Sequence, residues 1–460
     1  MMRDDCHVLL VIFPGQGQIN PCLQFAKRLL NFGVRLTLST TLFAIRRISA
    51  IPGIDFAPFS DGYDDGYKGP ADGFCHLYDS VKARGSEHVA NLVKAKAAEG
   101  TPFTRIIFTT LMAWVGEVAR SLQVPATLLW IQPATVLNIY YYYFSGFQDL
   151  FRSCGENGVV EFPGLPALAP TDFPSFMLSK TTTNNVLDWG IQAMKDQIDL
   201  INSEENPKIL VNTFDDLEVD ALRAIKKLTL IGIGPLVPSA YLDRKDPSDT
   251  SFGGDLREKS DNYIEWLDSQ PMSSVIYLAF GSYSDLPTTM AEQIAQGLVE
   301  SKMPFLWVLR ETANGEKPEE KLRCKKELEK QGKIVRWCTQ VEVLQHPAIG
   351  CFLTHCGWNS TIESLALGIP VVAFPLWSDQ ICNAKLLQDA WKIGVRVKAN
   401  EDGIVEAREL KRCIECVMGE EGAELRKNAM NWRELAKSSM KENGSSYLNL
   451  KAYVNDVLLN

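Results

Sequence analysis

The stretch from Trp337 to Gln380 reads WCTQVEVLQHPAIGCFLTHCGWNSTIESLALGIPVVAFPLWSDQ, and it decides the fold class. Two short apolar runs within it, Cys351–Thr354 and Val371–Phe374, have the length and composition of buried strands. Polar side chains follow each run directly. Because ligands of parallel α/β sheets bind beyond the carboxyl ends of the strands, this stretch predicts a ligand site on an α/β domain.

An aromatic side chain opens the stretch. Trp337 is predicted to end a strand, Ile334–Trp337, where its broad π face suits a flat base such as uracil. Cys338 follows and can offer its backbone N–H and C=O to the edge of that base. A lone tryptophan at such a place is more often a core residue, so only the neighbouring signals favour the binding role.

A turn of small residues leads into a helix predicted over Thr361–Leu367. The start of a helix carries free backbone N–H groups and a partial positive charge, which suit a diphosphate. Gly357 permits a close approach of the backbone, and His355 can donate to a phosphate oxygen. Asn359 or Ser360 could equally be a plain N-cap, which is the alternative for either residue alone.

Three further polar side chains complete the pattern of a nucleotide-sugar site. Glu363 is placed in the first turn of the predicted helix, where a carboxylate can accept from both ribose hydroxyls; the alternative is a favourable first-turn charge. Asp379 and Gln380 come after the strand Val371–Phe374 and suit sugar hydroxyls, with helix capping as the alternative. Each of these residues alone is a moderate indication of a nucleotide-sugar site, and their occurrence together in one short stretch is a strong one.

Upstream, the segment Phe280–Ser284 (FGSYS) closes another predicted strand with a glycine and two serines. Ser282 and Ser284 are therefore candidates for additional phosphate contacts. The segment is not a P-loop, because no lysine follows at the required spacing, and it is not the G-x-G-x-x-G fingerprint of a dehydrogenase.

Apolar runs and helical patterns alternate along the rest of the chain. Val8–Phe13, a helix from about Asn20 and Val34–Ser39 predict a β-α-β unit, and hence a parallel sheet. Residues 139–202 are expected to be less regular. We expect an N-terminal domain over 1–235, a linker rich in Pro, Ser, Asp and Gly over 236–261, a second domain over 262–441, and a C-terminal helix over 442–460 that packs on the first domain.

Composition excludes several classes of function. The formal net charge of −9 argues against a nucleic-acid partner. No apolar run approaches the length of a membrane span, and the start MMRDDC is acidic where a signal peptide is basic. The eleven cysteines have no framework or zinc spacing, which fits a reducing compartment. We therefore expect a cytoplasmic protein, and a monomer.

The stretch Trp337–Gln380 resembles the signature of plant family 1 UDP-glycosyltransferases, at full length and without gaps. Supporting matches are FPGQGQINP, LLWIQPATV and FGS. The resemblance implies a GT-B fold, in which two Rossmann-like domains face a cleft, and an inverting transfer from UDP-glucose to a small acceptor without metal or cofactor. The UDP-sugar residues that it implies are Ser282, Ser284, Trp337, Cys338, Gln340, His355, Gly357, Trp358, Asn359, Ser360, Glu363, Asp379 and Gln380.

Two positions depart from the family pattern. The general-base histidine is matched by Gln18, and the aspartate that often orients it is matched by Thr109. An amide is not a base at any useful pH, and loss of a positioned base typically costs about 10²–10⁴-fold in rate. Either the acceptor arrives ionised, as a carboxylic acid does, or another histidine serves, or the histidine was replaced or the enzyme is impaired.

The resemblance points to the branch that glucosylates carboxylic acids, hormones and anthocyanins. We expect a UDP-glucose-dependent glucosyltransferase that converts a small aromatic or carboxylic-acid acceptor to its β-glucoside. Gly17 and Thr135 are candidate contacts to the acceptor or the sugar. The alternative is a UDP-sugar-binding relative that lost catalysis together with its base.

Overall fold

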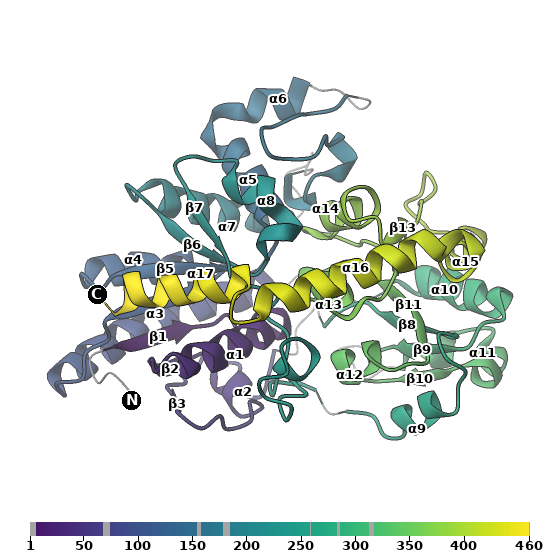
Figure 1. The fold of residues 1–460 in the computed structure, drawn as a ribbon, viewed down its shortest axis with the longest axis horizontal. Coiled ribbons are helices and arrows are strands. Elements are labelled where there is room, and N and C mark those ends of the chain that lie inside the picture. The colour runs from purple at the N-terminus through teal and green to yellow at the C-terminus, as the bar shows by residue number, and fades with distance from the viewer. Residues whose placement is uncertain are drawn as a thin grey trace. The chain divides into compact units, whose positions relative to one another are not determined.

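The computed structural model describes residues 6–67, 74–153, 158–177, 185–257, 259–282, 286–311 and 317–459. The chain divides into two compact units (Figure 1). Unit 1 contains Met1–Pro238, Phe252–Leu256 and Ser438–Asn460, and unit 2 contains Ser239–Ser251 and Arg257–Lys437. The segment expected to be a linker is therefore shared between the two units, because parts of it pack into each.

Unit 1 is built on a seven-stranded parallel sheet with the order β3-β2-β1-β4-β5-β6-β7. Its strands are β1 His7–Val11, β2 Arg35–Ser39, β3 Ile54–Phe56, β4 Arg105–Thr109, β5 Ala126–Trp130, β6 Lys208–Val211 and β7 Thr229–Gly232. Its helices are α1 Gln16–Asn31, α2 Leu42–Ile45, α3 Phe74–Ala98, α4 Ala113–Ser121, α5 Ala134–Tyr142, α6 Gln148–Ser153, α7 Asn185–Asn202, α8 Asp215–Arg223 and α17 Ser445–Tyr453.

Unit 2 is built on a six-stranded parallel sheet with the order β10-β9-β8-β11-β12-β13. Its strands are β8 Val275–Ala279, β9 Phe305–Val308, β10 Lys333–Val335, β11 Ile349–Thr354, β12 Val371–Ala373 and β13 Gly394–Arg396. Its helices are α9 Tyr263–Asp268, α10 Thr288–Ser301, α11 Lys325–Gln331, α12 Gln340–Leu344, α13 Trp358–Leu367, α14 Gln380–Lys385, α15 Ala407–Met418 and α16 Ala423–Met440, whose last residues belong to unit 1.

The two sheets share one topology. In each, the first strand in the sequence pairs with the second on one side and with the fourth on the other, so the winding direction reverses between β1 and β4 and between β8 and β11. At such a switch point the loops after the two strands diverge and leave room for a ligand. The predicted α/β fold with two Rossmann-like sheets is confirmed.

The end of the chain belongs to the core of unit 1. α17 packs against β7 (Figure 1). Leu450, Tyr453 and Val454 are buried with residues of the first strands and α1. The Tyr453 hydroxyl donates to Thr127 Oγ1 over 2.8 Å, which ties the helix to β5. No described helix has the length and apolar composition that a membrane crossing requires.

The stretch 139–202, expected to be less regular, contains more helix than predicted. α5 continues to Tyr142, and the chain then kinks at Ser145 and Gly146 before α6 begins. α3, which spans 25 residues, was not predicted. Its charged residues and its internal glycine weaken the apolar stripe on which helix prediction depends.

Candidate functional site

The predicted residues of unit 2 gather at the carboxyl edge of its sheet. Ser282 follows β8, Trp337 to Gln340 follow β10, His355 to Ser360 follow β11, and Asp379 and Gln380 follow β12. The central pair, β8 and β11, is the switch point of this sheet. Ser284 lies outside the described residues.

His355 stands between two glycines at this switch point. A Cβ atom on Gly281 would lie 2.6 Å from His355 Nε2, and one on Gly357 would lie 2.5 Å from the same atom. Both distances are impossible for a real Cβ, so the imidazole takes this place only because both neighbours lack a side chain. Gly281 also has a φ of +76°, which favours glycine.

The His355 ring is neutral in this environment. Burial and the nearby Arg310 guanidinium lower its pKa to about 4, although a hydrogen bond with the Ala279 carbonyl acts in the opposite direction. Arg310 follows β9 and donates to the Ser282 carbonyl over 2.7 Å. Sequence reasoning missed Arg310, because no local pattern marks an arginine after a neighbouring strand.

The helix after His355 begins earlier than predicted. Gly357 is the N-cap and α13 starts at Trp358, not at Thr361. The alternative that Asn359 or Ser360 caps the helix is therefore wrong, since both lie within its first turn. The prediction that Glu363 lies in the first turn is also wrong. The alternative role of Glu363, a favourable charge in the first turn, is therefore wrong as well. The backbone N–H groups of the true first turn begin beside the imidazole.

Glu363 is held by a hydrogen-bond network instead. Gln340 Nε2 donates to Glu363 Oε2 over 2.8 Å and to Ser360 Oγ over 2.9 Å. The Tyr277 hydroxyl donates to Gln340 Oε1 over 3.3 Å and lies 3.3 Å from Cys338 Sγ. Glu363 is only 3% exposed. Tyr277, a buried residue of β8, therefore connects the segments after β10 and β11, and sequence reasoning missed it.

The prediction that Trp337 ends its strand is wrong, because β10 stops at Val335. Hydrogen bonds with the segment expected to be a linker, residues 236–261, hold the backbone of Trp337 in place. Ser260 Oγ accepts from the backbone N–H groups of Arg336, over 3.0 Å, and Trp337, over 3.3 Å. The Ser260 N–H donates to the Trp337 carbonyl over 2.9 Å. Ser260 thus sets the path of the chain at the predicted base-stacking residue.

The Asp379–Gln380 pair is oriented by its own loop. Gln380 Oε1 accepts from the N–H groups of Leu376 and Trp377, over 3.0 and 3.1 Å, which directs its amide nitrogen away from them. Asp379 Oδ2 accepts from Asn383 Nδ2 over 2.7 Å, and the same nitrogen donates to the Cys356 carbonyl over 2.9 Å. Asp379 stands at the N-cap of α14 without a side-chain capping bond. Asn383, one helical turn after Asp379, is a further residue that sequence reasoning missed.

The side chain of Trp358 belongs to the core. It is 4% exposed, and its ring centroid lies 5.9 Å from that of Trp391. A contact of Trp358 with a sugar would therefore have to use its backbone.

In unit 1, two glutamines in the first turn of α1, the helix after β1, differ in their hydrogen bonding. Gln16 Nε2 donates to Asn20 Oδ1 and to the Gly254 carbonyl, and its oxygen accepts from the Leu256 N–H over 2.8 Å. Gln18, the third residue of α1, has a buried amide oxygen without a hydrogen-bond partner among the described residues. Gly17, beside it, is exposed. The position of the missing base therefore carries an amide whose oxygen could accept a hydrogen bond but is shielded from solvent.

Thr109 and Thr135 have partners within unit 1. Thr109 ends β4 and is fully buried, and its Oγ1 accepts weakly from the Phe13 N–H over 3.4 Å, across the switch point of this sheet. The Thr135 hydroxyl donates to Glu218 Oε1 over 2.7 Å. Because that hydrogen is committed, Thr135 could only accept a bond from a ligand.

Two of the other histidines have structural partners. His7 Nε2 lies 2.9 Å from Thr37 Oγ1, and the His88 ring stacks on Phe59 with Nε2 3.2 Å from the Ala57 carbonyl. Burial lowers the pKa of both imidazoles. His76 is exposed on α3.

Comparisons with known proteins agree with this arrangement. A family model described as UDP-glucoronosyl and UDP-glucosyl transferase matches residues 253–440. The UDP-glycosyltransferase 75C1 of Solanum lycopersicum is 52% identical over 97% of this chain and 98% of its own length. The anthocyanidin 3-O-glucoside 5-O-glucosyltransferase 1 of Perilla frutescens is 50% identical over 98% of both chains. The crystal structure of Os79 from O. sativa in complex with UDP superposes with a TM-score of 0.86, at 32% identity over 98% of this chain and 99% of that one.

Proposed function

Since the chain belongs to the plant family 1 UDP-glycosyltransferases and is an enzyme of that kind, we propose that it transfers glucose from UDP-glucose to a small aromatic or carboxylic-acid acceptor. Transfer inverts the anomeric configuration and gives a β-glucoside. The observation that carries the donor assignment is the set of cross-braced residues at the carboxyl edge of the unit 2 sheet. In it Gln340 holds Glu363, and Ser260 holds Trp337.

The proposed donor site follows the order of the strands. The Trp337 ring stacks on uracil, and Glu363 accepts from the ribose hydroxyls. The diphosphate lies at the first turn of α13, beside His355. Asp379 and Gln380 bind glucose, since the amide nitrogen of Gln380 is directed away from its own loop.

In the proposed reaction an oxygen of the acceptor attacks the anomeric carbon, the bond from that carbon to the diphosphate oxygen breaks, and UDP leaves. The growing negative charge on the departing oxygen is stabilised by the first turn of α13. The Arg310 guanidinium, whose charge is felt at His355, adds to this stabilisation. No metal or cofactor takes part in the proposed transfer.

Gln18 decides the proposed class of acceptor. A carboxylic acid is ionised at pH 7 and needs no base, whereas a phenol must lose a proton as it attacks. We propose that the amide nitrogen of Gln18 donates to such a carboxylate and orients it, because an ionised carboxylate only accepts hydrogen bonds. The relatives are named for acceptors of several kinds, including crocetin for a protein of Gardenia jasminoides and phloretin for one of Malus domestica. Because Gln18 stands where a base would be needed for phenols, we propose acids as the better acceptors.

The test compares a matched acid and phenol. We expect the unmodified protein to convert 2-naphthoic acid at least about 100-fold faster than 2-naphthol with UDP-glucose, because only the phenol needs a base. Gln18→His should raise the rate with 2-naphthol by about 10- to 100-fold. Gln18→Asn, which keeps an amide, should not. If Gln18→His does not raise the rate with 2-naphthol, the hypothesis that the enzyme lacks a general base is refuted. If no transfer to any acid is detected, the hypothesis that the acceptor arrives ionised is refuted.

The impaired-relative alternative makes the opposite prediction, namely that UDP-glucose binds but UDP is never released with any acceptor. Identities near 50% over the full length of named transferases lend it no support. We further propose a monomer in the cytoplasm. The Gardenia relative is named as chloroplastic, so the location needs its own measurement by fluorescent fusion.

A further inference from the structure

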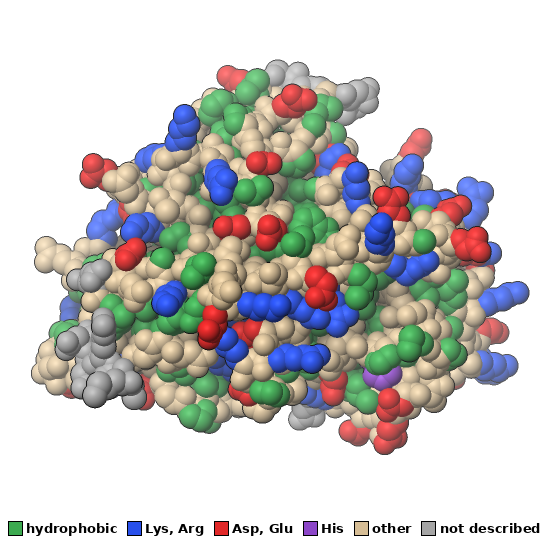
Figure 2. Space-filling view, in the orientation of Figure 1, with side chains coloured by type: hydrophobic (Ala, Val, Ile, Leu, Met, Phe, Trp, Pro, Cys, Tyr) green, Lys and Arg blue, Asp and Glu red, His purple; other side chains and the backbone are tan. Residues whose placement is uncertain are grey.

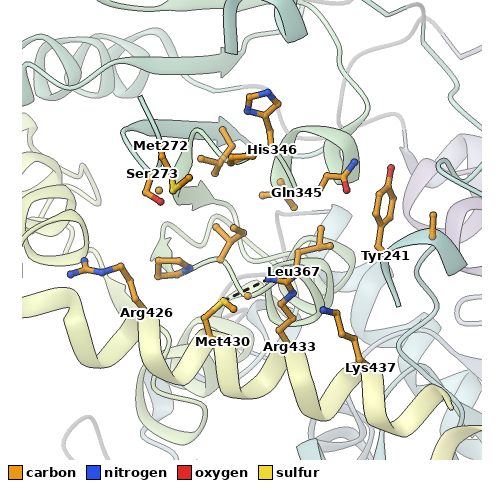
Figure 3. A pocket seen from close by; sticks show the side chains of 18 of the residues that line it. Tyr241, Met272, Ser273, Gln345, His346, Leu367, Arg426, Met430, Arg433 and Lys437 are labelled. Carbon is orange, nitrogen blue, oxygen red and sulfur yellow. Dashed lines mark hydrogen bonds between the residues drawn. The ribbon is translucent and has the colours of Figure 1, made fainter. Parts of the chain in front are cut away.

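A groove of about 610 Å³ lies in unit 2 at the amino ends of β8, β11 and β12, the sheet edge opposite the proposed donor site (Figure 3). Leu344, which ends α12, and Leu367, which ends α13, contribute to its wall. The donor residues Gln340 and Ser360 stand at the other ends of the same two helices. The groove is therefore separate from the donor residues, and the proposed function does not use it.

One face of α16 forms the far wall of the groove. Arg426, Met430, Arg433 and Lys437 follow one another at helical spacing, and Figure 3 shows all four side chains directed from α16 toward the groove. Figure 2 shows Lys and Arg side chains gathered along the region of α16. A stripe of three cations and one methionine offers charge and apolar contact together.

The lining is cationic although the whole chain is acidic. Arg244 joins the three cations of α16, the His346 imidazole also lines the groove, and no Asp or Glu occurs among the described residues of the lining. Carboxylates reach two of these five from outside the groove: Asp268 Oδ1 lies 3.1 Å from His346 Nε2, and Glu434 Oε1 lies 3.3 Å from Lys437 Nζ.

Two of the arginines have no carboxylate partner among the described residues. Within this part of the chain, the Arg433 side chain makes one hydrogen bond, from Nη1 to Met430 Sδ at 3.9 Å, and the exposed Arg244 side chain makes neither a hydrogen bond nor an ion pair. Arg426 is different, since it donates to the carbonyls of Val417 and Gly419. The groove thus holds positive charge that the protein itself leaves uncompensated.

Three methionines contribute to the apolar part of the lining, together with leucine, isoleucine and proline side chains. Met272 is 79% exposed and Met430 is 44% exposed, and Met418 lies deeper. Two glycines keep the floor open. A Cβ on Gly350 would lie 2.8 Å from Met418 Cε, and one on Gly368 would lie 3.0 Å from Met430 Sδ. Flexible thioether side chains adapt to ligands of different shape.

We propose that this groove binds a small amphiphilic anion. A flat apolar body packs against the methionines, and one carboxylate, sulfonate or phosphate group is held by Arg433, with Lys437 one turn further along α16. The guanidinium fork suits two oxygens of such a group. The volume fits a small molecule, since ligand sites typically measure about 300–1,000 Å³.

The three methionines provide a direct reporter of binding. The full chain is labelled with [methyl-¹³C]methionine, and the signals are assigned by single Met→Leu substitutions. With UDP present to fill the donor site, naphthalene-2-sulfonate should shift the signals of Met272, Met418 and Met430 saturably. The uncharged 2-methylnaphthalene should bind at least about tenfold more weakly, since it lacks the charge-assisted bonds.

Charge reversal tests the cationic wall. Arg433→Glu should weaken the binding of naphthalene-2-sulfonate by more than tenfold. Arg323 is an exposed arginine of unit 2 that does not line the groove, so Arg323→Glu should leave this affinity unchanged. Arg244→Glu provides a second variant if Arg433→Glu does not fold, because the Arg244 side chain is exposed and makes no hydrogen bond or ion pair with the described residues. The proposal is overturned if the three signals do not move, if the uncharged probe shifts them equally, or if the soluble charge reversals leave the affinity unaltered.

Discussion

Binding of UDP-glucose should make His355 take up a proton. In the free protein burial and Arg310 lower the pKa of this imidazole to about 4, so the ring is neutral near pH 7. Since one ring nitrogen donates to the Ala279 carbonyl, the other carries a lone pair in the neutral ring. A lone pair facing a diphosphate oxygen is repulsive. Protonation turns that contact into a charge-assisted hydrogen bond, so the diphosphate should raise the pKa of His355.

The size of the effect follows from Coulomb's law for an assumed separation between the ring and the phosphate. One phosphate charge at about 4–8 Å from the ring, at an effective dielectric constant near 20, favours the imidazolium by about 2–4 kcal/mol. This corresponds to about a 30- to 1,000-fold change in affinity between the fully protonated and the neutral enzyme. UDP-glucose should therefore bind most tightly at acid pH, and its affinity should fall as pH rises above the free pKa of about 4 until the pKa of the complex is passed.

Isothermal titration calorimetry measures this proton directly. UDP-glucose is titrated at pH 5 in two buffers of different ionisation enthalpy, without an acceptor. The sugar ester is preferable to UDP, whose terminal phosphate itself titrates near pH 6. The slope of the binding enthalpy against the buffer enthalpy should correspond to more than about half a proton taken up per complex.

A matched variant separates His355 from other groups. His355→Gln should bind UDP-glucose weakly, with no proton uptake and no fall of affinity with pH. Binding enthalpies that are independent of the buffer in the unmodified protein would refute the reasoning. An identical uptake in His355→Gln would assign the proton to another residue.

Three further predictions concern the residues that support these sites. Ser260→Ala removes the acceptor of the Trp337 N–H and should raise the KM for UDP-glucose about 5- to 10-fold with kcat unchanged, as steady-state kinetics would show; an unchanged KM would contradict it. Tyr277→Phe frees the Gln340 amide and should raise the same KM by about 3- to 10-fold, and a loss confined to kcat would speak against a positioning role. Glu218→Ala removes three hydrogen bonds at the start of α5 and should lower the free energy of unfolding of unit 1 by about 2–4 kcal/mol, measured by urea unfolding. A change below about 1 kcal/mol would contradict the role of the Glu218 carboxylate as a cap of α5.

The sequence predicted the strands better than the beginnings of helices. The expected strands Val34–Ser39 and Val371–Phe374 differ from β2 and β12 by one residue at one end. A buried parallel strand is a continuous apolar run with polar residues at both ends, so its limits are visible locally. The start of α13 was misplaced because no side chain caps it. Gly357 occupies the N-cap, and its place depends on a histidine ring packed against it.

Local sequence also could not show which polar groups meet. Tyr277, Gln340 and Glu363 are far apart in sequence, and they form one network only because β8 and β11 pair at the switch point of the sheet. For the same reason Ser260, in a segment expected to be a linker, holds Trp337. Hydrogen bonds between segments leave no periodic signal in either segment.

By itself the sequence determined the α/β class, the family and the order of polar residues along Trp337–Gln380, because each of these depends on short-range pattern and residue type. Tertiary structure decided the charge state of His355, the orientation of Glu363 and Gln380, and the cationic groove on the opposite edge of the sheet. Burial, neighbouring charges and hydrogen-bond partners set those properties, and parallel strands bring them together from distant parts of the chain.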